Sequence, residues 1–282
     1  VEKQGPAWAV LNGNMAMGMV SASRAMELAI EKAKNVGVAY VGVKNSCHFG
    51  AAGYYANMAA QAGMIGIAMS NTDPIMAVPG GCGVSIGSNP FSYAAPTGNG
   101  RSVFLDISLS NVAALKVVMA KEKGEILPDG CLVDYEGKPT TDPNTFPQNS
   151  SLMPMAAHKG YGLAVMVEIL SAVLTSAGIL SQVKSWNMDM ATPNNVGHAL
   201  IAIDVKQMMD KAEFESRMEE LCQELHSAKR AAGTKQIFMP GEMEWAKREK
   251  ALTENTIELN DMMVKNMEKL AEQFQLELNW AK

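Results

Sequence analysis

The sequence lacks an excess of positive charge, long apolar runs and closely spaced cysteines. Its 24 Lys and Arg residues against 29 Asp and Glu give a net charge of -5, so no basic field can hold a phosphate backbone and we expect no nucleic acid partner. No stretch of 18 apolar residues is free of charge or glycine, and the first residues, Val1-Glu2-Lys3-Gln4, are not those of a signal peptide. We therefore expect a cytoplasmic protein without a membrane partner. The four cysteines form no C-x-x-C pair, which predicts free thiols and no metal site.

Two nucleotide-binding fingerprints are also missing. A Rossmann domain needs G-x-G-x-x-G between a strand and a helix, and the nearest fragments, Gly81-Cys82-Gly83 and Gly98-Asn99-Gly100, lack the third glycine. There is no P-loop either. Residues 83–87 match the G-x-S-x-G elbow of serine hydrolases, but Pro90 follows and disfavours the helix that an elbow requires. A serine hydrolase is therefore the weakest functional alternative.

Helices and short β-rich runs alternate along the first 70 residues. Helical spacing predicts a helix over 21–36, with Ser21 as its N-cap and Gly37 just past its end. The next elements are predicted to be a strand over 38–43, a helix over 51–62 and a strand over 64–69. This alternation predicts an α/β sheet. Proline and glycine break residues 73–106 into loops and short strands, the last of which spans 103–106.

The second half of the chain adds longer helices and a change of composition. We expect helices over 110–123, 161–177 and 211–231, a loop over 137–151 and a strand over 199–203. The helix over 161–177 is apolar enough to be buried nearly all round, and the 22 methionines are expected to fill the core. Beyond Pro240 the chain turns charged and helical, through 242–250 and about 260–274. This predicts an α/β cofactor-binding and catalytic domain over 1–239 and a small helical part over 240–282.

Three positions carry side chains suited to chemistry. His48 lies at the carboxyl end of a predicted strand, where ligands bind in open α/β sheets and where an imidazole can exchange protons near neutrality. The alternative is a surface or helix-capping histidine. Lys159 precedes the apolar helix, whose free N–H groups favour an anion; the alternative is an ordinary helix entry. Asp106 can accept hydrogen bonds from a ribose or cap the following helix.

Six segments, in this order, resemble the type 2 malate/L-lactate dehydrogenase family over nearly the whole chain. They are Asn45-Ser46-Cys47-His48-Phe49-Gly50, Gly87-Ser88-Asn89-Pro90, Pro139-Thr140-Thr141-Asp142-Pro143, His158-Lys159-Gly160-Tyr161-Gly162, Val196-Gly197-His198 and Pro240-Gly241-Glu242. The resemblance implies a nicotinamide-dependent oxidoreductase with a mixed-sheet, non-Rossmann α/β domain, which explains the missing fingerprint. It also implies a homodimer.

The resemblance implies roles for nine residues. His48 matches the proton acceptor used when a 2-hydroxy acid is oxidised, and the donor in the reverse direction, while the nicotinamide carries the hydride. No role carries over to Lys116, because Leu115 stands where family members often have glycine. The positions that match cofactor-contacting residues are Thr72, Asp106, Ile107, Ser108, Lys159, Gly241, Glu242 and Met243.

We therefore predict an NAD(P)-dependent dehydrogenase that interconverts a small 2-hydroxy acid and its 2-oxo acid, of the malate or L-lactate type, with NAD favoured over NADP. The alternative is a non-catalytic nucleotide-binding relative. Family members begin with a helical segment ahead of the point where Val1 aligns, and that segment carries a histidine and an arginine of the substrate site. We expect the C-terminal helical part to pack with such a segment.

Overall fold

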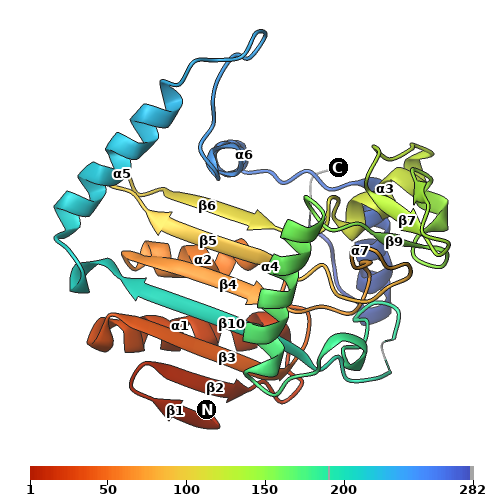
Figure 1. Ribbon diagram of the computed structural model, residues 1–282, viewed down its shortest axis with the longest axis horizontal. Helices are drawn as coiled ribbons and strands as arrows, with labels where there is room; N and C mark the ends of the chain where they lie inside the picture. Colours follow the sequence, from red (N-terminus) through yellow and green to blue (C-terminus); the bar gives the residue numbers. More distant parts are fainter. Residues whose placement is uncertain (190, 280–282) are drawn as a thin grey trace. The chain divides into compact units, whose positions relative to one another are not determined.

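The computed structural model describes residues 1–189 and 191–279 (Figure 1). Internal contacts divide the chain into two units, Val1–Gly241 and Glu242–Lys282. The second unit contains two helices, α6 (Glu242–Glu254) and α7 (Asp261–Phe274). The domain boundary predicted between residues 239 and 240 stays a prediction.

A seven-stranded mixed sheet forms the centre of the first unit, in the order β1-β2-β3-β10-β4-β5-β6. Strands β2 and β3 run parallel and the other neighbours run antiparallel, so the predicted mixed-sheet α/β fold is confirmed. The strands are β1 (Lys3–Gly5), β2 (Trp8–Asn12), β3 (Val38–Ser46), β4 (Met64–Ser70), β5 (Phe91–Pro96), β6 (Ser102–Ile107) and β10 (Val196–Asp204). Because β10 pairs with both β3 and β4, it brings a late segment of the chain against two early ones.

Helices cover both faces of this sheet (Figure 1). Helices α1 (Gly18–Val36) and α2 (Ala52–Gln61) pack on one face through a core rich in alanine. Helix α4 (His158–Glu168) lies on the other face and continues into one π-helical segment, η2 (Ile169–Val173). Met26, Met64, Met69 and Met76 are buried, whereas others such as Met188 are exposed, so methionine fills the core only in part.

Helix α1 begins earlier than predicted. It starts at Gly18, and the residue before it, Met17, makes no capping hydrogen bond through its side chain, so the prediction of Ser21 as N-cap is wrong. The reason is a close approach: a Cβ on Gly18 would meet the backbone carbonyls of Cys47 and His48. The helix therefore starts where glycine lets it touch the turn after β3. At its other end, Gly37 has φ 86° and ends the helix as predicted.

The predicted apolar helix differs most from expectation. It is α4 followed by η2, and four of its side chains are 43% to 58% exposed: Leu163, Ile169, Val173 and Leu174. The prediction of burial all round is wrong because only one side of this helix packs on the sheet. That packing is close, since a Cβ on Gly197 of β10 would meet the carbonyl of Ser171.

A small second sheet overlaps the region over 137–151 that was predicted as a loop. Its order is β8-β7-β9, with β7 (Leu132–Asp134), β8 (Pro139–Thr140) and β9 (Ser150–Leu152). One turn of 3-10 helix, η1 (Pro143–Thr145), lies between β8 and β9. Helix α3 (Ala114–Lys123) precedes this sheet and ends at Gly124 in the left-handed conformation, as predicted. Strands of two or three residues give almost no periodic signal, so the sequence did not indicate them.

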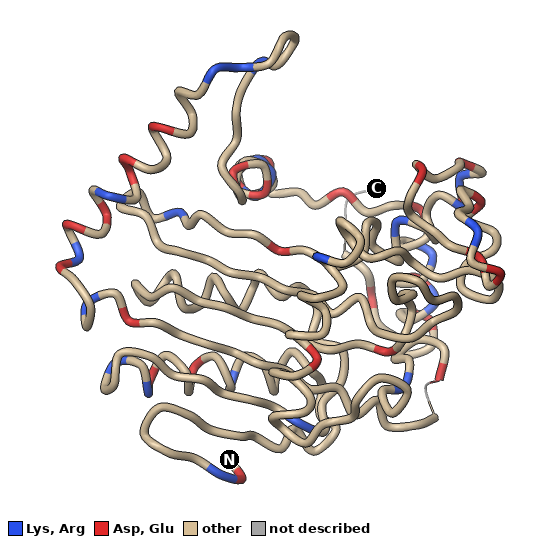
Figure 2. The backbone as a smooth tube through the Cα atoms, in the orientation of Figure 1, with Lys and Arg blue, Asp and Glu red and all other residues tan. Residues whose placement is uncertain are grey.

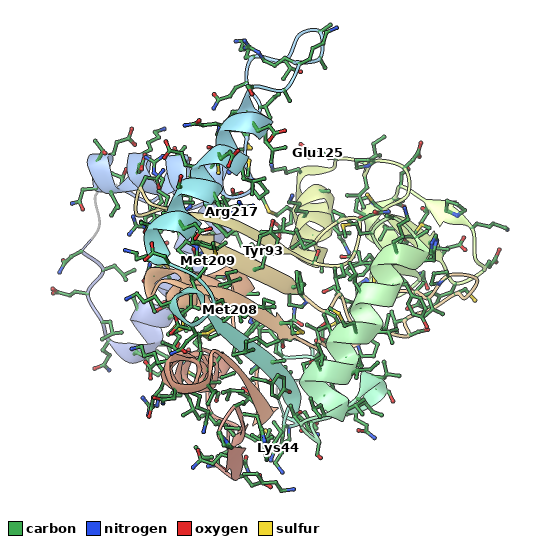
Figure 3. All side chains as sticks on the ribbon, turned by 60° about the vertical axis from the view of Figure 1, so that its left-hand side comes forward. Lys44, Tyr93, Glu125, Met208, Met209 and Arg217 are labelled. Atoms are coloured by element: carbon green, nitrogen blue, oxygen red, sulfur yellow. The ribbon has the colours of Figure 1, made fainter. Side chains whose placement is uncertain are left out.

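The connection after β10 is short and partly exposed. A 3-10 turn, η4 (Val205–Gln207), leads to Met208 and Met209, both labelled in Figure 3. Helix α5 (Lys211–His226) follows, capped by the Asp210 carboxylate, and carries both charge signs (Figure 2). It ends five residues before the predicted limit. In the part of the chain that the structure describes, no helix has the length and apolar character needed to cross a membrane.

Candidate functional site

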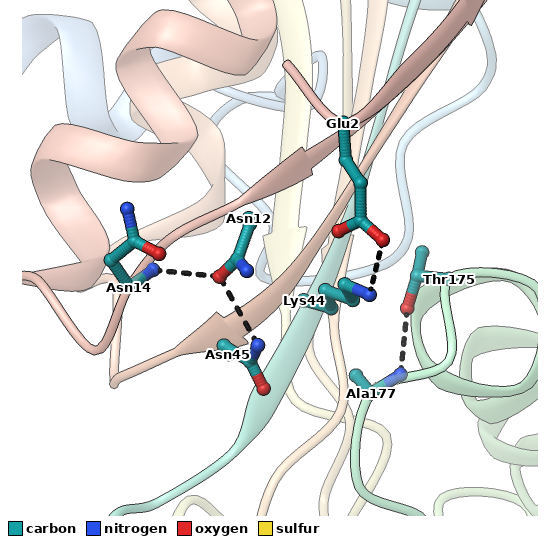
Figure 4. Close-up of polar contacts among 7 residues, drawn as sticks. All are labelled: Glu2, Asn12, Asn14, Lys44, Asn45, Thr175 and Ala177. Atoms are coloured by element: carbon teal, nitrogen blue, oxygen red, sulfur yellow. Dashed lines mark hydrogen bonds and ion pairs between the residues drawn. The ribbon is translucent and has the colours of Figure 1, made fainter.

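The turn that carries His48 is tied to the strand beside it. Asn45, near the end of β3, has φ 52°. Its Nδ2 donates to Oδ1 of Asn12, 3.1 Å away, and the same oxygen accepts from the backbone N–H of Asn14 at 3.0 Å (Figure 4). An ion pair between Lys44 Nζ and a Glu2 carboxylate oxygen, 2.8 Å, lies one residue earlier. These contacts hold the carboxyl end of β3 against β2, so the following turn starts from a fixed point.

His48 lies partly exposed just beyond this strand, as the sequence predicted. Its ring stacks on that of Trp186, with centroids 4.7 Å apart and planes inclined by 28°. Its Nδ1 accepts a hydrogen bond from the N–H of Gly50 at 3.3 Å. Burial of part of the ring lowers the pKa of His48 below its ordinary 6.5, and the negative charge of Asp73 opposes this shift. The lowered pKa favours a neutral imidazole at neutral pH, which is the form that accepts a proton.

A second histidine, His198 of β10, lies buried beneath this turn. Its Nε2 is 2.9 Å from Ser46 Oγ and its Nδ1 is 2.9 Å from Ser70 Oγ, so it bridges β3 and β4. Its ring stacks on Phe49, with centroids 4.6 Å apart. Burial lowers the pKa of His198 to about 3, so the ring is neutral. This neutral ring supports both residues that flank Cys47 and His48.

Three of the predicted cofactor-contacting segments lie next to one another in the first unit. The Thr72 N–H donates to Asn89 Oδ1 at 3.0 Å. The Leu109 N–H, just after β6, donates to the Ser88 carbonyl at 2.8 Å, and the Leu109 carbonyl accepts from the Met155 N–H at 2.9 Å. Met155 lies three residues before α4. The segments around Thr72, the end of β6 and the entry of α4 therefore form one continuous region.

Asp106 of β6 faces the beginning of α2. Its Oδ2 accepts from the Gly53 N–H at 2.8 Å, and a Cβ on Gly53 would lie 2.9 Å from that oxygen. A carboxylate at a helix N-terminus stabilises the helix through its free N–H groups. The alternative that Asp106 caps the following helix, α3, is wrong, because α3 has no side-chain cap; the carboxylate bonds the first turn of the earlier helix α2 instead. Its cofactor role, like those of Ile107 and Ser108, stays a prediction.

Lys159 is the second residue of α4 and is exposed. Ala156 and Ala157 before it have φ of 48° and 54°, conformations that cost energy for residues other than glycine and that cluster at functional sites. The N–H groups of Lys159 and Gly160 donate to carbonyls of the preceding turn, so fewer amides are free than the sequence predicted. Among the described residues the Lys159 ammonium has no hydrogen bond or ion pair, and its charge is available to an anion.

The predicted late cofactor loop includes the point in the sequence where the first unit ends, at Gly241, and the second begins, at Glu242. Gly241 has φ 92°, and a Cβ there would meet the ring of Phe104 on β6. The preceding carbonyl, of Pro240, accepts from the Phe104 N–H at 3.1 Å. Glu242 and Met243 begin α6 of the second unit. Their cofactor role stays a prediction.

Sequence reasoning missed two residues of this region. Trp186 lies in an irregular segment that gives no periodic signal, and only its stacking on His48 reveals it. Glu168, at the end of α4, is 6% exposed. It is the lone charged residue of the predicted apolar helix over 161–177, and that pattern is a signal, because carboxylates are almost never fully buried without partners.

Two other chemistries find no support in the geometry. Ser85 of the G-x-S-x-G match lies in a loop, next to an isolated β-bridge between Met76 and Ile86. No helix follows Ser85, so the required elbow is absent from this segment. All four cysteines are free, as predicted. Over residues 1–189 and 191–279, no three His, Cys, Asp or Glu side chains are grouped to hold a metal ion.

Comparison with known proteins identifies the family. A family model described as malate/L-lactate dehydrogenase matches residues 1–268. The malate/(S)-sulfolactate dehydrogenase of Methanothermus fervidus is 40% identical over 280 residues, which cover 99% of this chain and 80% of that protein. The ureidoglycolate dehydrogenase (NAD(+)) of Escherichia coli is 35% identical over 261 residues, covering 93% and 74%. The structure of sulfolactate dehydrogenase from Methanocaldococcus jannaschii matches with a TM-score of 0.89 and 36% identity, covering 98% of this chain and 78% of that one. The chain belongs to the malate/L-lactate dehydrogenase family.

Proposed function

We propose that the protein is an NAD(P)-dependent dehydrogenase of a small 2-hydroxy acid, of the malate or L-lactate type. The observation that carries this proposal is the state of His48: a ring at the end of a strand, partly exposed, with a lowered pKa and Asp73 close enough to act on it. A bound nicotinamide supplies the hydride acceptor. His48 takes the proton of the substrate hydroxyl in oxidation and returns it in reduction.

The donor set fits a nicotinamide dinucleotide. The Lys159 ammonium, at the N-terminus of α4, offers the positive charge that a pyrophosphate needs, and no acidic residue lies in the first turn of this helix. Thr72 adds a hydroxyl group on the neighbouring segment. We favour NAD over NADP because the related ureidoglycolate dehydrogenase is named for NAD(+). The names of the relatives support malate, sulfolactate, ureidoglycolate and lactate as the compounds to test.

The first experiment titrates NADH and NADPH onto the folded protein by fluorescence. Turnover is then measured with malate, L-lactate, sulfolactate and ureidoglycolate. We expect saturable cofactor binding and oxidation of at least one hydroxy acid. Binding without turnover of any of the four would favour the non-catalytic nucleotide-binding alternative. A folded protein that binds neither cofactor would refute both.

The role of His48 has its own test. His48→Asn should reduce turnover by about a hundredfold or more, the usual contribution of a general base, while the dissociation constant for NADH changes little. His226→Asn, on the exposed end of α5, is the matched control and should keep full activity. Turnover that survives in His48→Asn would show that another group accepts the proton.

We also infer that the protein forms a homodimer through the exposed apolar row of α4 and η2. Leu163, Ile169, Val173 and Leu174 leave an apolar stripe in water on one chain, and such stripes mark association surfaces. Sedimentation should show a dimer that Val173→Lys converts to a monomer. A dimer that persists in this variant would place the interface elsewhere. The cytoplasmic location stays a prediction.

A further inference from the structure

Glu168 is a buried carboxylate whose three described partners are all uncharged donors. Its Oε1 accepts from Asn71 Nδ2 at 3.2 Å and from the Leu180 N–H at 2.9 Å, and its Oε2 accepts from Asn89 Nδ2 at 2.9 Å. No ion pair with lysine or arginine forms at this carboxylate within the described residues. A buried charge is costly unless hydrogen bonds satisfy it. A group retained at such a cost in an otherwise apolar helix needs an explanation.

One partner leads directly to the predicted cofactor segment. Asn89 lies at φ 36°, a conformation outside the usual range for a side-chain-bearing residue. Its Oδ1 accepts the Thr72 N–H, while its Nδ2 donates to Glu168 and to the Ala164 carbonyl of α4. Glu168 therefore orients the amide that holds Thr72, although 79 residues separate Glu168 from Asn89.

The other partners lead to the segment over His48. The Leu180 N–H bonded to Glu168 belongs to the 3-10 turn η3 (Leu180–Gln182), six residues before Trp186. Asn71, the residue before Thr72, adds a contact between the two sides, because its Nδ2 donates both to Glu168 Oε1 at 3.2 Å and to the Gly178 carbonyl at 2.8 Å. The chain from Gly178 to Trp186 thus starts at this carboxylate and ends on the ring of His48.

We propose that Glu168 is a positioning residue that couples Thr72 to the chain from Gly178 to Trp186. One carboxylate then holds the predicted cofactor side of the site, at Thr72, and the proton-transfer side, at His48. This inference rests on the proposed function for its catalytic meaning. Its structural content, that one side chain holds both segments, stands on the hydrogen bonds alone.

The two oxygens can be separated by mutation. A glutamine at position 168 has one oxygen and one NH₂ group. Its oxygen must take the place of Oε1, because the Leu180 N–H is a backbone donor and cannot be turned. Its NH₂ then faces Asn89 Nδ2, donor against donor. Asn89 cannot reverse its amide, since Oδ1 holds Thr72. Glu168→Gln should therefore release Asn89, which holds the Thr72 N–H, and keep the bonds at Oε1 to Leu180 and Asn71, whereas Glu168→Ala releases all three.

The test measures amide hydrogen exchange of Thr72 and Leu180 by NMR. We expect Glu168→Gln to lower protection of the Thr72 amide at least tenfold with Leu180 unchanged, and Glu168→Ala to lower both. Val117→Ala, in the core at α3, is the control for a general loss of stability and should leave the ratio of the two protections unchanged. Equal loss at both amides in Glu168→Gln, or no loss in Glu168→Ala, would overturn the proposal.

Kinetics supply the functional readout. In Glu168→Gln we expect the KM for the cofactor to rise about tenfold with kcat within twofold of the parent, while Glu168→Ala also lowers kcat because Trp186 no longer holds its place on His48. A fall in kcat alone in Glu168→Gln would contradict the assignment of Oε2 to the cofactor side. If the parent binds no cofactor, the proposed function fails, and the exchange experiment still decides whether Glu168 couples the two segments.

Discussion

Acid should destabilise this protein through His198. The ordinary pKa of histidine is 6.5 and that of buried His198 is about 3. Between pH 6.5 and pH 3, position 198 is therefore protonated in the unfolded chain and neutral in the folded chain. A depressed histidine pKa therefore contributes stability above pH 6.5 that is lost as the pH falls toward 3. Each pH unit in this window costs about 1.4 kcal/mol of unfolding free energy. His198 alone should remove about 2 kcal/mol between pH 6.5 and 5.

The assay compares urea unfolding at pH 7 and pH 5 for the parent and for His198→Asn. The asparagine amide can still bond Ser70 but cannot titrate, so the variant starts less stable and loses about 2 kcal/mol less between the two pH values. Leu200→Ala, two residues along β10 and fully buried, is the matched control: it should be destabilised by about 2–5 kcal/mol and keep the parent's pH dependence. An unchanged pH dependence in His198→Asn would refute the reasoning.

Three further predictions concern neighbouring residues. Trp186→Ala should raise the pKa of His48 toward 6.5, because solvent regains the ring face that the indole covers; NMR titration of the ring protons measures the shift, and a lower pKa would contradict it. Ala157→Gly should raise the free energy of unfolding by about 1 kcal/mol by relieving its positive φ, and a loss of stability on urea titration would exclude that strain. Asp106→Ala should cost about 1 kcal/mol through the lost cap on Gly53, and an unchanged melting temperature would show that water replaces it.

Local patterns located most of the fold. The helix ended by Gly37, the strand that leads to His48 and the helix ended by Gly124 all follow from spacing and stop signals within about 20 residues. The placement of β10 between β3 and β4 does not, because it depends on pairing between residues more than a hundred positions apart. Trp186 was missed for a similar reason: its stacking on His48 joins two residues more than a hundred positions apart, and Trp186 lies in an irregular segment.

The candidate site shows the same division. The sequence placed His48 at the end of a strand and Lys159 at the start of a helix, since both positions follow from elements in their own neighbourhood. For Asp106 the sequence left two hypotheses open, a ribose contact and a cap on the following helix. The helix that this carboxylate contacts is the earlier α2. The contact between Asp106 and α2 depends on tertiary packing. A capping rule that uses only neighbouring residues of the sequence cannot predict it.

The two histidines at this end of the sheet, His48 and His198, should affect different properties as the pH falls: His48 the rate of the proposed reaction, and His198 the stability of the fold. His198 stays neutral down to about pH 3, so above pH 5 His48 is the histidine of this pair that changes charge. In the proposed mechanism oxidation needs neutral His48, so kcat/KM for oxidation should fall with a slope of one below the pKa of His48, which lies under 6.5. In the same mechanism reduction needs the protonated ring, so its kcat/KM should fall above that pKa. Stopped-flow rates in both directions between pH 5 and 8 test this, and a slope of two on the acid side of the oxidation profile would mean that a second group besides His48 must also lose a proton.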